Sequence, residues 1–234
     1  MCRMIAYCGD NAEDLRKLFA FFRDGSQCDP KVKAAFQGCE GHPHGWGYVL
    51  HNGGGLAHYR TARPVWEDDA ELPPLRPGKI WAILHSRLTG EDSILSPLCS
   101  HPFVAPMVHQ TIYLAHNGGL VKPPGVPAQV VDSEWALGEL VKEPGGLAAL
   151  LPSLKAHQPA ALNLFVFTVP RAAASSPVLQ GLYYHERPDR EDYYQVYAAE
   201  LPGGRALISS TFADNVKAMG ATVRKLSLGE IVTL

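Results

Sequence analysis

The chain has 234 residues, of which 46% are hydrophobic and 19% charged, and its formal net charge at pH 7 is −2. This composition is typical of a globular domain with a sizeable core, and the nearly balanced charge gives no electrostatic case for nucleic acid or an anionic membrane. No apolar run approaches the roughly 18–20 residues of a membrane span, no secretory signal precedes residue 20, and five irregularly spaced cysteines argue against a disulfide framework. We therefore expect one cytoplasmic domain over residues 1–234, with no nucleic-acid or membrane partner.

The first quarter of the chain combines one strand, two helices and a hairpin. Alternation predicts a strand over 2–8, with Cys2 and the other even-numbered residues on one face. Helix-start signals then predict helices over 12–23 and 30–36. β-formers on both sides of an Asn-Gly-Gly-Gly turn predict a hairpin over 46–61.

Strands dominate the rest of the sequence. Two nearly continuous apolar runs, at 80–85 and 111–115, predict strands that are covered on both faces. Helices are expected over 132–142 and 147–154, the second interrupted near Pro152. Further strands are predicted over 162–169, 178–185, 193–199, 206–210 and 231–233. This order favours an α+β domain with two sheets and helices outside them.

The chain begins Met1-Cys2-Arg3, which places a cysteine directly after the initiator methionine. Removal of Met1 would give Cys2 a free α-amino group, and its usual pKa of about 7.7–8.0 leaves a share unprotonated at neutral pH. Such an amine can activate its own side chain as a nucleophile. Taken alone, however, this start favours the simpler interpretation of a buried cysteine in a first strand.

A polar stretch, His85-Ser86-Arg87, follows the apolar run at 80–85. Functional side chains often emerge where a buried strand ends. The planar fork of Arg87 suits a carboxylate, such as that of an amino-acid substrate. The alternative is a surface arginine in an ordinary ion pair.

The second apolar run is followed by His116-Asn117-Gly118-Gly119. An asparagine amide and a glycine N–H can together form an oxyanion hole, since glycine lets the backbone approach a ligand closely. Asn-Gly is also the commonest turn dipeptide, so a turn explains this stretch equally simply.

Val131-Asp132-Ser133-Glu134 precedes the helix expected from residue 132. Asp132 fits the N-cap position of that helix. Its carboxylate could also receive the ammonium group of a substrate, and the two interpretations are compatible.

Six stretches together, in their order and spacing, resemble the class II glutamine amidotransferase domain, especially its stand-alone members. They are MCRMIAYCG (1–9), HGWGYVL (44–50), LHSR (84–87), SHPF (100–103), LAHNGGL (114–120) and DSEWAL (132–137). The resemblance extends to 147–169 and 208–212, and so covers nearly the whole chain. It implies a four-layer αββα sandwich of the N-terminal nucleophile hydrolase type.

The resemblance also implies a reaction. Cys2, exposed by removal of Met1, would attack the side-chain amide of glutamine, form a γ-glutamyl thioester, and release ammonia and then glutamate without a cofactor. With no fused synthase domain expected, ammonia used for synthesis would pass to a separate partner protein. The other outcome is hydrolysis of a modified γ-glutamyl amide, and His44, where many relatives carry aspartate, leaves that substrate open.

The implied roles of single residues follow the motifs. Asn117 and the N–H of Gly118 would form the oxyanion hole. Arg87 would hold the α-carboxylate of glutamine, and Asp132 its α-ammonium group. Three further residues would shape the pocket: Trp46, Gly47 and His101.

Two other interpretations remain at this stage. The spacing of Cys39, His42 and His44, with Cys28 and His51 nearby, would allow a structural zinc site, although no CxxC pair accompanies it. A catalytically silent module on the same fold is the second, because a fold does not fix a function. The sequence keeps all five residues with implied catalytic or substrate-binding roles, which argues against a catalytically silent protein. They are Cys2, Arg87, Asn117, Gly118 and Asp132.

Overall fold

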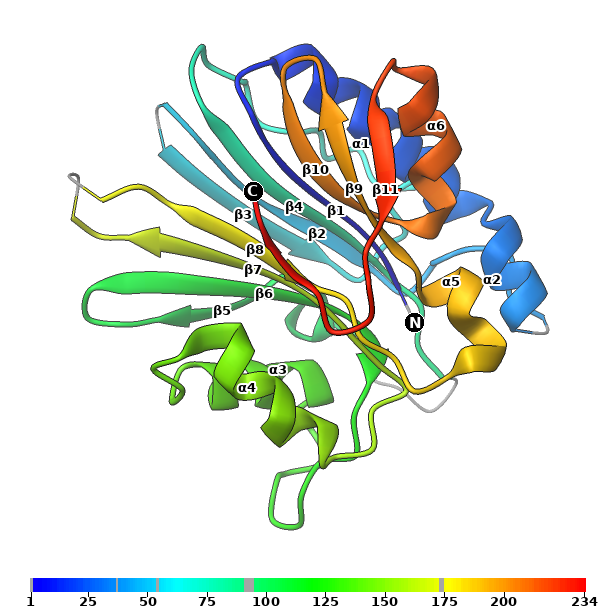
Figure 1. Ribbon diagram of the computed structural model, residues 1–234, viewed down its shortest axis with the longest axis vertical. Helices are drawn as coiled ribbons and strands as arrows, with labels where there is room; N and C mark the ends of the chain where they lie inside the picture. The colour runs from blue at the N-terminus through cyan, green and yellow to red at the C-terminus, as the bar shows by residue number, and fades with distance from the viewer. Residues whose placement is uncertain (1, 37, 54, 91–94, 173–174) are drawn as a thin grey trace.

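The computed structural model describes residues 2–36, 38–53, 55–90, 95–172 and 175–234. Its described strands form two antiparallel sheets, one of seven strands and one of five. Figure 1 shows the two sheets lying one above the other, with helices outside them. The expected mixture of helices with two sheets is therefore confirmed.

The seven-stranded sheet is built around the N-terminal strand. β1 (Cys2–Gly9) lies in its interior, paired on one side with β4 (Ile80–Arg87) and on the other with β10 (Gly204–Ser209). The sheet order is β11-β9-β10-β1-β4-β2-β3, in which the outer strands are β2 (Trp46–Asn52), β3 (Gly55–Thr61), β9 (Val196–Leu201) and β11 (Thr222–Lys225). Residues 5–9 are thus held between two strands, whereas residues 2–4 pair with β4.

The five-stranded sheet has the order β12-β8-β7-β6-β5. Its members are β5 (Phe103–Pro106), β6 (Gln110–Gly119), β7 (Ala161–Pro170), β8 (Val178–Leu182) and β12 (Ile231–Thr233). The long central strands, β6 and β7, pair over their full length.

Helices cover the outer face of each sheet (Figure 1). α1 (Ala12–Gln27) and α6 (Ala213–Ala218) lie on the seven-stranded sheet, while α3 (Asp132–Leu140) and α4 (Gly146–Lys155) lie on the five-stranded one. The short helices α2 (Pro30–Ala35) and α5 (Glu191–Tyr194) lie beside one another, and 3₁₀ turns span Pro97–Cys99, Pro188–Arg190 and Ser210–Phe212. Among the described helices, none has the length and apolarity that a bilayer crossing requires.

Three apolar layers hold these elements together. Residues Ile5 and Tyr7 of β1 pack with α1 residues such as Phe22, whereas Met4 and Ala6 face the opposite sheet. A third layer lies between the five-stranded sheet and α3 and α4. The alternation of β1 explains its double burial, because successive side chains point to opposite faces. Each fully buried large side chain contributes about 1.5–3 kcal/mol.

Several boundaries differ from the sequence expectation. β4 continues to Arg87 and β6 to Gly119, so both polar stretches lie inside strands rather than beyond them. α4 runs through Pro152, whose ring is exposed, because its leucines remain packed on the sheet. α5 (Glu191–Tyr194) replaces the start of the strand expected from residue 193, and β5 and β11 were not foreseen.

Candidate active site

Cys2 lies where the two sheets meet. Its backbone pairs with Arg87 of β4, and its side chain is 5% exposed. The Cys2 N–H donates to Asn117 Oδ1 across the gap between the sheets, with an N···O distance of 2.8 Å. Residues 115 positions apart in sequence are therefore in direct contact, and both lie on strands that hold them firmly.

The environment favours the thiolate form of Cys2. Burial by itself raises the pKa of a thiol, because it disfavours charge. Here the positive charge of the amino terminus and the charge and hydrogen-bonding capacity of His85 outweigh burial, assisted by the backbone of Leu88, and lower the pKa of Cys2 to about 5. A cysteine with such a pKa is a competent nucleophile at neutral pH.

The side-chain amide of Asn117 has a hydrogen-bond donor without a partner among the described residues. Because Oδ1 accepts the Cys2 N–H, the amide nitrogen must be the other terminal atom. That nitrogen, Nδ2, is buried and has no hydrogen-bond partner among the residues that the structure describes. An unsatisfied buried donor costs roughly 1–3 kcal/mol, so its presence beside a reactive thiol points to a ligand or transition state as its partner.

Gly118 follows Asn117 in β6, opposite Leu162 of β7. A Cβ at this position would collide with the Ala161 carbonyl oxygen, so only glycine fits. The interpretation of His116–Gly119 as a turn is wrong, since these residues continue the strand. The close approach of backbones here comes from strand pairing.

His116 and Asp132 join β6 to the start of α3. His116 Nε2 lies 3.0 Å from the Ala161 carbonyl oxygen, which can only accept, so Nδ1 receives the Ser133 hydroxyl proton at 2.9 Å. Asp132 Oδ2 accepts the Leu120 N–H at 2.9 Å and Oδ1 the Ser133 N–H at 2.8 Å. The N-cap position belongs to Val131, which makes no side-chain cap, so the expectation of Asp132 as N-cap is wrong by one residue.

A cavity of about 180 Å³ adjoins the thiol. Five of the eight residues that the sequence singled out line it: Cys2, Arg87, His101, Gly118 and Asp132. The guanidinium of Arg87 comes from the end of β4 and the carboxylate of Asp132 from the start of α3, and together they give one small cavity two opposite charges. Such a pair matches the two charged α-groups of a free amino acid.

The remaining residues that the sequence singled out lie around this cavity. Trp46 points to the helix side of the seven-stranded sheet, where its indole N–H donates to Asp68 Oδ2 at 2.8 Å, and it does not line the cavity. Gly47 lies on the opposite face, and a Cβ there would collide with the His101 carbonyl oxygen. Gly47 therefore allows the segment that carries His101 to approach the sheet.

His44 holds the end of β4. Its N–H donates to the Arg87 carbonyl oxygen at 3.0 Å, and its Nδ1 accepts the Thr89 N–H at 3.0 Å. Burial, the Arg87 charge and the amino terminus lower the pKa of His44, so the ring is neutral at neutral pH and can accept this bond. The sequence linked His44 to zinc binding and to the choice of substrate, and did not predict these backbone contacts with β4.

The zinc hypothesis does not agree with the geometry. Within the described ranges, no three metal-binding side chains come together. His42 instead lies 2.9 Å from Asp29 Oδ2, which Arg3 Nε also contacts at 2.5 Å. Sequence reasoning missed this buried Arg3–Asp29–His42 network, whose members are far apart along the chain.

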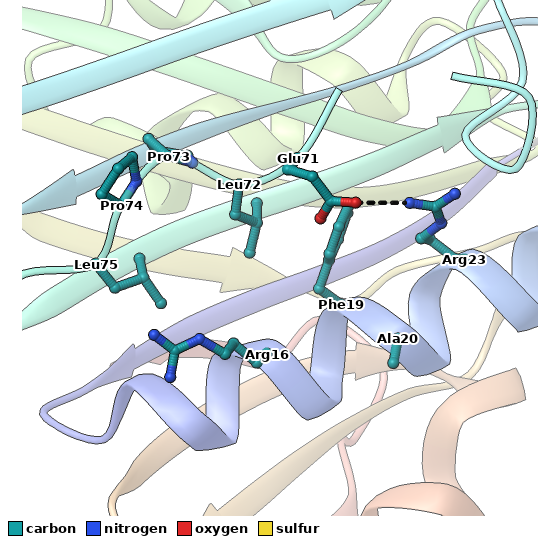
Figure 2. A pocket seen from close by; sticks show the side chains of 9 residues that line it. All are labelled: Arg16, Phe19, Ala20, Arg23, Glu71, Leu72, Pro73, Pro74 and Leu75. Carbon is teal, nitrogen blue, oxygen red and sulfur yellow. Dashed lines mark hydrogen bonds and ion pairs between the residues drawn. The ribbon is translucent and has the colours of Figure 1, made fainter. Parts of the chain in front are cut away.

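The hollow beside α1 lacks comparable chemistry. A hollow of about 470 Å³ between α1 and residues 71–75 is shown in Figure 2, where the Arg23–Glu71 ion pair crosses its rim at 3.4 Å. No cysteine or histidine is among the residues that line it. A cavity of about 980 Å³ lies nearer the thiol, and Leu88 and Thr89 belong to its wall and to that of the Cys2 cavity.

Comparison with known proteins shows the fold. No family model matches the chain, and a search of curated proteins finds no match. Among solved structures, the allosteric regulatory enzyme of purine biosynthesis is similar over 100% of this chain, with a TM-score of 0.64 and 15% identity. This chain spans 46% of that longer protein.

A second solved structure, a predicted glutamine amidotransferase from Pseudomonas aeruginosa PA01, is 16% identical and covers 100% of this chain and 93% of its own, with a TM-score of 0.46. Sequence identities this low are evidence for a shared fold and not for a shared activity. At that level, the chain resembles class II glutamine amidotransferases.

Proposed function

We propose that this protein hydrolyses the side-chain amide of glutamine with Cys2 as nucleophile, in the manner of class II glutamine amidotransferases. The observation that carries the proposal is the Asn117 amide, whose Oδ1 binds the Cys2 N–H while its Nδ2 is buried without a partner in the described part of the chain. In the same proposal, the two sheets and their outer helices form a four-layer αββα sandwich of the N-terminal nucleophile hydrolase type, as a single domain over 1–234.

The first half of the reaction forms a thioester. Removal of Met1 exposes the α-amine of Cys2, which takes the thiol proton, through a water, and leaves a thiolate. The thiolate attacks the side-chain amide carbon of glutamine, and Asn117 Nδ2 and the Gly118 N–H stabilise the oxyanion. Collapse of this intermediate transfers a proton to the amide nitrogen, so ammonia leaves and a γ-glutamyl thioester remains.

The second half releases glutamate. A water molecule loses a proton to the base, attacks the thioester carbon and returns Cys2 to its starting state. Throughout, Arg87 holds the α-carboxylate of the substrate and Asp132 its α-ammonium group. Asp132 is held for this task by the N–H groups of Leu120 and Ser133. No cofactor takes part.

The ammonia has a use in this proposal. A separate synthase, docking in the cytoplasm, would use it for biosynthesis. The fold match extends over the whole chain, whereas the purine enzyme is more than twice as long.

A second candidate function is hydrolysis of a larger γ-glutamyl amide. The observation that favours it is the cavity of about 980 Å³, which shares the wall residues Leu88 and Thr89 with the cavity at Cys2. Phe36 and Trp66 line this larger cavity together with Arg190. It has room for a leaving amine far larger than ammonia.

One assay tests both candidates. Glutamate release is measured with L-glutamine and with γ-glutamyl amides of aromatic amines, using protein shown by intact mass to have lost Met1. We expect release with wild type and with Cys8→Ala, whose cysteine lies on the same strand face, and none with Cys2→Ala. Equal release by Cys2→Ala would contradict the proposal, and the preferred amide identifies the substrate class.

A further inference from the structure

His85 lies beside Cys2 without a role in the reaction described above. It pairs with Met4, two residues along from the Cys2–Arg87 pair, and is fully buried. Because side chains alternate along strands, His85 and Cys2 project from the same face of the sheet as diagonal neighbours. Diagonal neighbours on antiparallel strands are within reach of each other when one side chain is long.

Hydrogen bonding fixes the tautomer of this ring. His85 Nε2 lies 3.1 Å from the His116 carbonyl oxygen, which can only accept. Nε2 therefore carries the proton in the neutral ring, and Nδ1 presents a lone pair. Nδ1 is buried and has no hydrogen-bond partner among the described residues that meets the usual geometry. His85 lies on the same sheet face as Cys2 and is close enough for its charge and hydrogen-bonding capacity to act on the thiol, so its acceptor nitrogen is available there.

His101 packs against His85 and carries no positive charge. His101 stacks on it, with ring centroids 4.0 Å apart, from the segment before β5. Burial, together with the charges of His85, His116 and Arg87, lowers the pKa of His101 well below its usual value, so His101 is neutral. Arg87 and the amino terminus are further cationic groups that act on His101, and a charge on His85 stabilises the Cys2 thiolate.

We propose that His85 is a catalytic proton acceptor for the Cys2 thiol. The S–H bond breaks and its proton bonds to Nδ1, which gives a thiolate beside an imidazolium whose Nε2–H still donates to the His116 carbonyl. After attack on the amide carbon, the imidazolium returns this proton to the departing amide nitrogen. The proposal rests on Cys2 as the nucleophile and adds a second base to the α-amine.

The hydrogen bond between Cys2 and Asn117 explains why a base separate from the Cys2 nitrogen is useful. The nitrogen of Cys2 is a donor to Asn117 Oδ1 at 2.8 Å, so it is held towards the oxyanion hole. His85 approaches from β4 and leaves that hydrogen bond intact. The oxyanion donor can therefore stay in position while the thiol is deprotonated.

The test measures thiolate formation separately from turnover. Proteins that have lost Met1 are alkylated with iodoacetamide between pH 4 and 10, and the Cys2 peptide is quantified by mass spectrometry. The variants are His85→Gln, which keeps a donor for the His116 carbonyl but has no basic nitrogen, and His51→Gln as a control on β2 of the same sheet. His85→Asn serves as a second variant, and circular dichroism confirms that each protein folds.

We expect the alkylation midpoint of wild type and His51→Gln to lie well below that of a free thiol. In His85→Gln the midpoint should rise by at least one pH unit, and glutamine kcat should fall about 100-fold or more with KM little changed. An unchanged midpoint and kcat in a folded His85 variant would overturn the role of His85 and leave the proposed function standing. A raised midpoint in protein that hydrolyses no γ-glutamyl amide would support the Cys2–His85 pair and sink the proposed function.

Discussion

Cys2 and Arg3 are adjacent in sequence and both are buried, but their side chains lie on opposite faces of β1. Arg3 points to the helix side of the seven-stranded sheet, where Asp29 receives donors from Arg3, His42, Thr211 and the Lys31 backbone. Cys2 points to the gap between the sheets, where Asn117 Nδ2 and both ring nitrogens of His101 have no hydrogen-bond partner among the described residues. On the Arg3 face the opposite charges of Arg3 and Asp29 are paired, although Arg3 Nη2 and His42 Nδ1 also lack partners there. The difference between the two faces of β1 is therefore one of charge pairing.

The difference separates stability from function. Opposite charges on the Arg3 face are matched within the protein, so that face fixes the start of β1. Unmatched polar atoms on the Cys2 face raise the energy of the empty site and become useful only when substrate supplies the partners. Substitutions on the two faces should therefore change different measurable quantities.

The largest effect is expected from Asp29→Asn on the stabilising face. It leaves the buried Arg3 without its counter-charge, which costs roughly 3–5 kcal/mol of unfolding free energy. Urea unfolding measures this loss. Asp192→Asn is the control, because its ion pair with Lys31 is exposed on the aspartate side and should be worth at most about 1 kcal/mol. Equal losses in the two variants would show that the buried network has no special role.

Asn117→Ala should act on turnover instead. Loss of one oxyanion donor costs ~2.7–4 kcal/mol at the transition state, so kcat should fall about 100- to 1000-fold while KM stays nearly constant. Steady-state kinetics of glutamate release measure both values. Asn163→Ala, which removes the register partner of Asn117 on β7, should spare kcat. A defect confined to KM would argue that Asn117 binds substrate and does not stabilise the oxyanion.

Arg87→Lys tests substrate binding on the same face. Lysine keeps the charge but loses the planar fork, so KM should rise about 10- to 100-fold, equivalent to roughly 1.5–3 kcal/mol, with kcat largely retained. Arg205→Lys, an exposed change on β10, is the control. If KM is unchanged, the substrate carboxylate is held elsewhere.

The smallest effect concerns His42 and pH. Burial lowers the pKa of His42 to about 4, against about 6.5 when unfolded, even though Asp29 favours its charged form. Between these values the unfolded chain binds a proton that the folded chain does not, so stability falls as pH falls. Unfolding free energy should drop by roughly 2 kcal/mol from this residue between pH 7 and 4.5. His42→Gln should show a correspondingly weaker pH dependence; an identical one would contradict the assignment.

Much of the fold could be predicted because its strands and helices have regular apolar patterns. The failures occurred where polar residues continue a strand. His85–Arg87 and His116–Gly119 end the apolar runs, yet they pair with β1 and β7, and the sequence does not display such long-range pairing. The predicted interruption of the helix near Pro152 was also wrong. The packing of α4 on the sheet outweighs the backbone hydrogen bond that proline removes.

The candidate site was predictable only in part. Motif order pointed to Cys2, Arg87 and Asp132, which the structure gathers at one cavity. The Arg3–Asp29 contact could not be predicted, because no local sequence pattern around either residue indicates its partner. His85 escaped because its importance depends on an unpaired ring nitrogen, and only three-dimensional structure reveals which buried atoms lack partners.

The most direct test of Cys2 as nucleophile is intact-mass analysis before and after treatment with a diazo-ketone analogue of glutamine. We predict that the mature protein lacks Met1, gains the mass of one analogue, and carries it on Cys2. Cys2→Ala should gain nothing. Absence of an adduct on protein shown to have lost Met1 would contradict the assignment of a glutamine-like substrate to this cysteine.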